Sequence, residues 1–214
     1  MRVAVFGDFN GDHFWLQRLL KQTENERIDK RICHGDIARK LSKHETDKTQ
    51  KCIILLNDYG VECCRGNNER EILDNLEKAN IDTDSIAFFR KLPQHLILGE
   101  LPHVLFCHKS PGGRFLIGAK KDEFEIMEND FSDQRIAFFG HSHIRFHHHK
   151  QQGKIHSNYF PKFNTLYDVS SGIHLVNTGT TNRNFPFSFN IRPGYVIYDS
   201  DNQTIEFKRI KVRD

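Results

Sequence analysis

Aspartate, asparagine and histidine side chains follow a series of short apolar runs in this 214-residue chain. These side chains offer oxygen or imidazole nitrogen to hard and borderline divalent cations. Each apolar run is typical of a strand, and side chains that leave strand ends can converge. In chain order the motifs are Gly7-Asp8-Phe9-Asn10, Gly35-Asp36, Gly66-Asn67-Asn68-Glu69, Cys107-His108 and Gly140-His141-Ser142-His143. The sequence therefore predicts one metal site assembled from distant segments.

The order and types of these residues resemble the calcineurin-like metallophosphoesterase superfamily. Its pattern runs Asp-x-His, Gly-Asp, Gly-Asn-His-Asp/Glu, His and then Gly-His-x-His. The resemblance spans nearly the whole chain and extends to Arg65, to Ser110-Pro111 and to Asn177-Thr178-Gly179-Thr180. Two positions depart from the pattern, because Asn10 and Asn68 stand where the family usually has histidine.

The resemblance implies two divalent cations, with Asp36 as the ligand that bridges them. The other implied ligands are Asp8, Asn10 and His143 for the first cation and Asn67, His108 and His141 for the second. An amide oxygen at Asn10 favours oxygen-preferring ions, so manganese is expected, with magnesium, iron, nickel or zinc as alternatives. The alternative is that Asn10 does not ligate and that the site binds only one metal tightly, with His13 or His34 as candidates to compensate.

Two residues, Asn68 and Arg65, are predicted to act on the phosphate. The family histidine at the position of Asn68 contacts the phosphate and assists the leaving group, whereas an asparagine donates a hydrogen bond but delivers no proton. General acid catalysis typically contributes about 10² to 10⁴ in rate, so its loss favours nucleotide-like, aryl or anhydride leaving groups. Arg65 is predicted to clamp a phosphate oxygen, with an ion pair to Glu62 or Glu69 as the alternative.

The composition is that of an ordinary globular protein, with 37% hydrophobic and 28% charged residues. A net charge of +3 neither indicates nor excludes nucleic acid. No apolar run reaches membrane-spanning length, so no membrane partner is expected. Five cysteines without Cys-x-x-Cys spacing predict a reduced, cytoplasmic setting. The sequence contains neither a phosphate-binding P-loop nor a Gly-x-Ser-x-Gly elbow, which argues against nucleotide-triphosphate motors and serine hydrolases.

Strand and helix patterns alternate in the first half, and strands dominate the second half. This order predicts an α/β protein with helices outside packed sheets. The resemblance implies a four-layer α/β/β/α sandwich of the metallophosphoesterase type, with the site at the strand ends. We expect a single domain over residues 1–214, with residues 144–171 as a candidate strand-rich insert beside the site. Within it, His147-His148-His149 is interpreted as part of a surface strand or loop.

The predicted function is that of a metal-dependent phosphoesterase. It would hydrolyse a small phosphodiester or phosphomonoester, with a nucleotide-type ester among the candidates, by attack of metal-bound hydroxide. The alternative is a catalytically impaired family member that acts as a protein- or nucleotide-binding scaffold. The expected partner is a small phosphorylated substrate, and the sequence does not indicate an oligomeric state.

Overall fold

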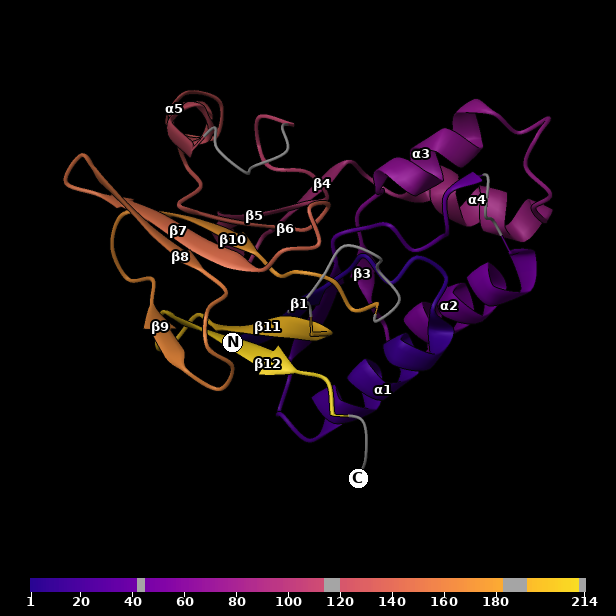
Figure 1. Cartoon of the computed structure of the whole chain (residues 1–214), viewed down its shortest axis with the longest axis horizontal. Helices are drawn as coiled ribbons and strands as arrows, with labels where there is room; N and C mark the ends of the chain where they lie inside the picture. The colour runs from indigo at the N-terminus through magenta and orange to yellow at the C-terminus, as the bar shows by residue number, and fades with distance from the viewer. Residues whose placement is uncertain (42–44, 114–119, 183–191, 212–214) are drawn as a thin grey trace.

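Two six-stranded sheets form the centre of the computed structural model, which describes residues 1–41, 45–113, 120–182 and 192–211 (Figure 1). The first sheet has the order β3-β2-β1-β11-β12-β9. Its strands are β1 (Arg2–Phe6), β2 (Lys30–Cys33), β3 (Glu62–Cys63), β9 (Leu166–Asp168), β11 (Gly194–Asp199) and β12 (Thr204–Arg209).

The second sheet has the order β4-β5-β6-β10-β7-β8. Its strands are β4 (His95–Leu98), β5 (Leu101–Cys107), β6 (Ile136–Phe139), β7 (Phe146–Gln151), β8 (Lys154–Tyr159) and β10 (Ile173–Asn177). The helices in the described residues are α1 (His13–Glu24), α2 (Thr46–Asp58), α3 (Asn67–Asp74), α4 (Thr83–Lys91) and α5 (Lys120–Asp130).

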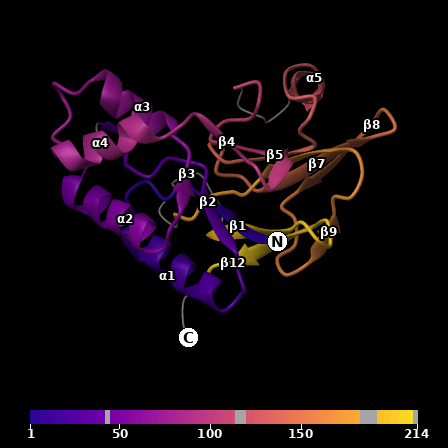
Figure 2. The same ribbon diagram turned by 180° about the vertical axis from the view of Figure 1, so that it is seen from behind.

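Alternation along the strands produces the layers, because successive side chains of a strand point to opposite faces. In β1, Val3 and Val5 belong to the core between the two sheets, whereas Ala4 and Phe6 pack beneath the helices. Helices α1 to α4 cover the first sheet, and α5 lies on the outer face of the second (Figures 1 and 2). The arrangement is the four-layer α/β/β/α sandwich expected from the sequence.

Parallel pairing explains how distant motifs meet. Strands β1, β2 and β3 run parallel in the first sheet, and β5, β6 and β10 run parallel in the second. Their carboxyl ends therefore lie along one edge of the sandwich, where ligands of α/β proteins characteristically bind. The predicted ligand motifs directly follow five of these six strands.

Three segments outside the ligand motifs complete the fold, and the histidine run is the one that differs from its expected place on the surface. The apolar run at residues 52–56 lies within α2, whose buried Cys52, Ile53 and Leu56 face the first sheet. Segment 144–171 contributes β7 and β8 to the second sheet and β9 to the first. The histidine run lies in β7, and His147 and His148 are buried rather than on the surface. No helix of the described residues is long and apolar enough to cross a membrane.

Candidate metal centre

The backbone at the strand ends aims the predicted ligands inward. Five of the predicted ligands adopt a left-handed backbone, which non-glycine residues rarely adopt. They are Asp8, Asn10, Asp36, His141 and His143, with φ between 49° and 63°. Such conformations cost about 1–3 kcal/mol each and cluster at functional sites, where the surrounding structure holds them. Five other described non-glycine residues also have a positive φ and lie outside the predicted motifs, namely Arg27, Gln152, Phe160, Asn164 and Gln203, so strain alone does not distinguish the site.

A first group of ligand atoms is formed by Asp8, Asp36 and His143. All three residues are buried, and their ligand atoms lie within 4.8 Å of one another. His143 Nε2 is 3.4 Å from Asp8 Oδ1. Two carboxylates and an imidazole in this arrangement match the ligand set predicted for the first cation, apart from Asn10.

A second group surrounds His108 Nε2. This nitrogen lies 2.8 Å from Asn67 Oδ1, 3.3 Å from His141 Nδ1 and 3.3 Å from Asp36 Oδ1. The structure therefore brings together all the residues predicted for the second cation. Asp36 belongs to both groups, as expected of a residue that bridges two cations.

The buried carboxyl groups of Asp8 and Asp36 have raised pKa values and no cationic side chain paired with them among the described residues. The pKa of Asp8 is raised well above its ordinary value by burial and then by nearby Asp36. Burial likewise raises the pKa of Asp36 to about 7. Neither carboxyl pairs with a lysine or arginine of the described chain, and buried charges need a counter-ion or a metal. A divalent cation between these groups fits that deficit.

The histidines are held in the form that binds metals. Burial is the main cause that lowers the pKa of His108 and of His143 to about 3, and of His141 to about 4. These imidazoles are therefore neutral at physiological pH, which leaves a nitrogen lone pair for a cation. The mixture of carboxylate, amide and imidazole donors suits a hard or borderline ion, so the residues fit a divalent metal.

Glu69 fixes the loop that carries Asp36. Its buried carboxylate accepts hydrogen bonds from the amides of Asp36 at 3.0 Å, Ala38 at 2.8 Å and Gly66 at 2.8 Å. These bonds tie the loop after β2 to the start of α3. The sequence placed Glu69 in a motif but did not predict this positioning role.

Asn10 and Asn68, the two residues that depart from the family pattern, are hydrogen-bonded to each other. Asn68 Nδ2 donates to Asn10 Oδ1 at 2.7 Å and to the Ala38 carbonyl at 2.9 Å. Asn68 Oδ1 in turn accepts a hydrogen bond from Asn67 Nδ2 at 3.0 Å. Because both amide hydrogens of buried Asn68 are committed, this side chain positions Asn10 and Asn67. Its contact with a phosphate stays a prediction.

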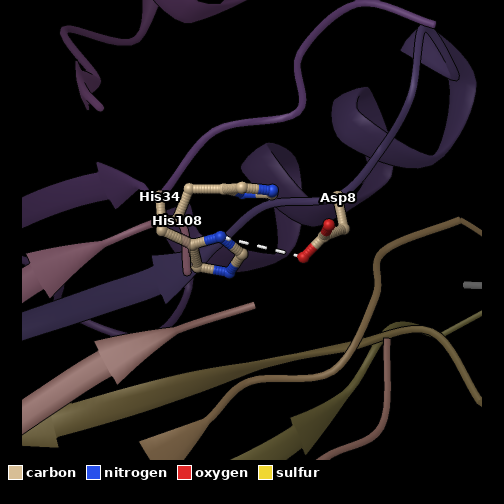
Figure 3. Close-up of side chains that lie close together, drawn as sticks. All are labelled: Asp8, His34 and His108. Carbon is tan, nitrogen blue, oxygen red and sulfur yellow. Dashed lines mark ion pairs between the residues drawn. The ribbon is translucent and has the colours of Figure 1, made fainter. Parts of the chain in front are cut away.

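From the sequence, His34 is only a candidate to compensate for a missing ligand at Asn10. In the structure, it lies among the candidate ligands. Its ring lies with Asp8 and His108 in a further group whose ligand atoms are within 4.8 Å of one another (Figure 3). His34 Nδ1 is 3.8 Å from Asp8 Oδ2, and His34 Nε2 is 2.7 Å from Thr178 Oγ1. A Cβ at Gly7 or Gly140 would collide with this ring, which explains the glycine at both positions.

Three cationic side chains, those of Arg65, Lys109 and Lys40, lie near the ligand groups. Arg65 is half-buried and forms no ion pair among the described residues, since Glu62 pairs with Lys30 and Glu69 binds backbone amides. Exposed Lys109 and Lys40 lie close enough to lower the pKa of Asp36. The positive charges favour an anion beside the ligand group.

This chain is similar to a known protein family and to several solved structures. The family model for the calcineurin-like phosphoesterase superfamily domain matches residues 1–203. A metallophosphoesterase from Sphaerobacter thermophilus has a TM-score of 0.76 at 19% identity, covering 100% of this chain and 90% of that one. The phosphoesterase Yfce from E. coli has a TM-score of 0.50 at 15% identity, covering 99% and 100%.

A further similar structure is described as a novel archaeal phosphodiesterase, with a TM-score of 0.50, 12% identity and coverage of 98% of this chain and 99% of that one. No curated protein matches the chain. The structural likenesses show the shared fold, and the family model covers nearly the whole sequence. The chain therefore belongs to the calcineurin-like phosphoesterase superfamily.

Proposed function

We propose that this protein is a metal-dependent phosphoesterase that hydrolyses a small phosphodiester or phosphomonoester. The observation that carries the proposal is the position of Asp36, whose buried carboxylate belongs to both groups of ligand atoms. Family membership and the phosphodiesterase and phosphoesterase names of similar structures support the reaction class.

The residues that would hold the cations are those of the two groups. Asp8 and His143 would hold the first, Asn67, His108 and His141 the second, and Asp36 both, while Asn10 is the proposed additional ligand of the first. Divalent cations at such sites supply an acidified water as nucleophile and neutralise phosphate charge. We propose manganese, because oxygen donors predominate in the first group.

The chain itself would bind and orient the phosphate. The guanidinium of Arg65 and the ammonium of Lys109 offset the charge of a bound phosphate from the solvent side of the ligand group. Asn68 donates a hydrogen bond that holds the side-chain oxygen Oδ1 of Asn10 in place. No proton donor stands at the position of Asn68, so esters whose leaving groups are weak bases should react fastest.

The surroundings of the cysteines agree with a reduced compartment. All five are free and buried. We therefore propose a cytoplasmic setting, in which such thiols stay reduced.

Hydrolysis assays test the proposal directly. Chelator-treated protein is given Mn²⁺ and then bis-p-nitrophenyl phosphate or p-nitrophenyl phosphate, and release of p-nitrophenolate is followed. The matched variants are Asp36→Ala in the ligand group and Asp168→Ala, an exposed aspartate of β9. We expect metal-dependent turnover that Asp36→Ala abolishes and Asp168→Ala retains. Absence of turnover despite demonstrated Mn²⁺ binding would instead support a scaffold that has lost catalysis.

A further inference from the structure

His34 has no part in the proposed function, yet its side chain is fully buried beside the candidate ligands. The residue directly follows β2 of the first sheet, and its ring reaches to the second sheet. There, Nε2 lies 2.7 Å from Oγ1 of Thr178, which directly follows β10. A ring in such a place needs partners for both nitrogens, because an unsatisfied buried polar atom costs stability.

The other ring nitrogen of His34, Nδ1, has no hydrogen-bond partner among the described residues. It faces the carboxylate of Asp8, whose Oδ2 is 3.8 Å away (Figure 3). Two glycines make this approach possible. A Cβ at Gly7 would collide with the ring, and a Cβ at Gly140 would collide with both the ring and Asp8 Oδ2.

The two carboxylate oxygens of Asp8 have different surroundings. Oδ2 accepts a hydrogen bond from the amide of His141 at 2.9 Å and faces the ring of His34. Oδ1 lies 3.4 Å from Nε2 of His143 and has no hydrogen-bond partner in the part of the chain that the structure describes. Oδ1 is therefore the oxygen available to a cation, and the groups around Oδ2 decide how the carboxylate is turned.

One tautomer of His34 satisfies these groups together. Burial lowers the pKa of His34 well below its ordinary value, so the ring is neutral and carries one proton. A carboxylate that binds a cation is ionised and only accepts hydrogen bonds. The proton therefore belongs on Nδ1, which faces Asp8. Nε2 then accepts from the hydroxyl of Thr178, whose other acceptor, the Gly179 carbonyl, is farther away at 3.4 Å.

We propose that His34 is a positioning residue, whose Nδ1–H turns the carboxylate of Asp8 so that Oδ1 faces the first cation. Thr178 holds the ring in the orientation that this requires. His34 itself does not ligate, because the group of ligand atoms that it forms with Asp8 includes neither Asp36 nor His143. The inference rests on the proposed function and adds a supporting residue from outside the proposed ligand set.

The Mn²⁺ affinity of variants tests this role. The full chain is treated with chelator and titrated with Mn²⁺, and the electron paramagnetic resonance signal of free Mn²⁺ gives the affinity. His34→Phe keeps a ring but removes the donor. We expect it to weaken binding at the first site about 10–100-fold, as the loss of other residues that support a ligand does. His34→Asn offers an amide N–H near the position of Nδ1 and should restore most of the affinity.

Two further variants separate positioning from a general effect on the core. Thr178→Val keeps the shape of the side chain but removes the hydroxyl, so it should weaken binding by less than His34→Phe does. His174→Phe is the matched control. His174 is also buried, but it lies near the start of β10, at the opposite end from Thr178. This control should leave the Mn²⁺ affinity unchanged.

Nitrogen NMR distinguishes positioning from ligation in the unaltered chain. The protein is labelled with ¹⁵N in its histidines and loaded with Zn²⁺, which is diamagnetic. Correlations between the ring nitrogens and their protons then report the state of each nitrogen. We expect a proton on Nδ1 of His34 and none on Nε2. A proton on Nε2 instead, or a His34 nitrogen bound to Zn²⁺, would overturn the proposal.

The outcomes separate this inference from the proposed function, because none of them depends on turnover. Equal Mn²⁺ affinities of the unaltered chain and His34→Phe would overturn the positioning role, even if metal-dependent hydrolysis is observed. So would a loss of affinity that His34→Asn does not restore. Weaker binding in His34→Phe, recovery in His34→Asn and a proton on Nδ1 would establish the role, even if no ester is hydrolysed. An unaltered chain that binds no Mn²⁺ would overturn both proposals.

Discussion

Two regions of this molecule are rich in histidine, and they use it differently. In the candidate metal centre, His108, His141 and His143 lie beyond strand ends. Imidazole nitrogens of His108 and His143 approach carboxylate or amide oxygens, and His141 Nδ1 lies 3.3 Å from His108 Nε2. In the second sheet, a histidine row lies across the middle of neighbouring strands. It consists of His147 and His149 of β7, His156 of β8 and His174 of β10.

The rings of the histidine row stack on one another instead of converging. His149 is the register partner of both His156 and His174, with ring centroids 4.7 Å and 5.6 Å away. His174 Nε2 donates to the Ser171 carbonyl, so His174 Nδ1 accepts its 2.9 Å hydrogen bond from His147 Nε2. Among the described residues, the row contributes to no group of converging ligand atoms.

The difference shows that position along a strand decides what a histidine does. Side chains on one face of a sheet stand side by side, so their nitrogens point in similar directions. Residues beyond a strand end are free of that constraint, and the left-handed backbone of His141 and His143 turns them toward Asp8 and Asp36. We therefore expect chemistry from the metal centre and only packing from the row.

The largest expected effect is the difference in turnover between two variants, each of which lacks one histidine from one of the two regions. His108→Ala deletes a proposed ligand and should lower metal-dependent turnover more than the roughly 10–100-fold cost of losing a residue that merely supports a ligand. His149→Ala in the row should leave turnover unchanged. Initial rates with bis-p-nitrophenyl phosphate at saturating Mn²⁺ provide the measurement. Equal losses in the two variants would break the comparison.

A smaller effect is expected from the hydrogen bond between Asn68 and Asn10. Asn68→Ala removes a buried donor from the Asn10 and Ala38 oxygens and should lower the free energy of unfolding by about 1–3 kcal/mol. Urea unfolding of chelator-treated protein measures this loss. The control is Gln151→Ala, whose side chain makes an exposed hydrogen bond to Ser171 at the end of β7.

A double-mutant cycle sharpens the same test. Because the two amides are in contact, Asn10→Ala and Asn68→Ala should be coupled by about 0.5–3 kcal/mol. Additive losses would show that the two departures from the family pattern are independent, contrary to their contact in the structure.

Lowering the pH should reduce the folding stability of the protein through His147 and His174, the buried members of the row. Burial lowers their pKa values to about 3 and about 4. In the unfolded chain the pKa of histidine is about 6.5, so the unfolded state takes up protons first as the pH falls. Stability should be full above about pH 6.5 and should decline toward pH 4, by about 1.4 kcal/mol per pH unit for each such histidine.

The variant His147→Gln isolates this contribution. Urea unfolding between pH 7 and 5, with Mn²⁺ present to bind the histidines of the metal centre, should show a shallower decline in the variant. An unchanged slope would mean that His147 does not titrate as its burial requires.

Sequence patterns predicted which ligand-type residues converge better than they predicted the residues that support them. Asp8, Asp36 and His108 could be found because ligand-type residues directly follow apolar runs that are typical of strands. The contact between Asn10 and Asn68 joins residues 58 positions apart, and no local pattern encodes it. His34 depends on the space that Gly7 and Gly140 leave, and His147 is covered by Tyr167 of the other sheet.

The central claim is that Asp36 joins two groups of ligands into one dinuclear centre. Titration of the chelator-treated protein with Mn²⁺, followed by electron paramagnetic resonance, tests it most directly. We predict an exchange-coupled signal that grows with the second equivalent of Mn²⁺ and is lost in Asp36→Ala. A spectrum of isolated Mn²⁺ at every stage of the titration, unchanged by Asp36→Ala, would contradict the account.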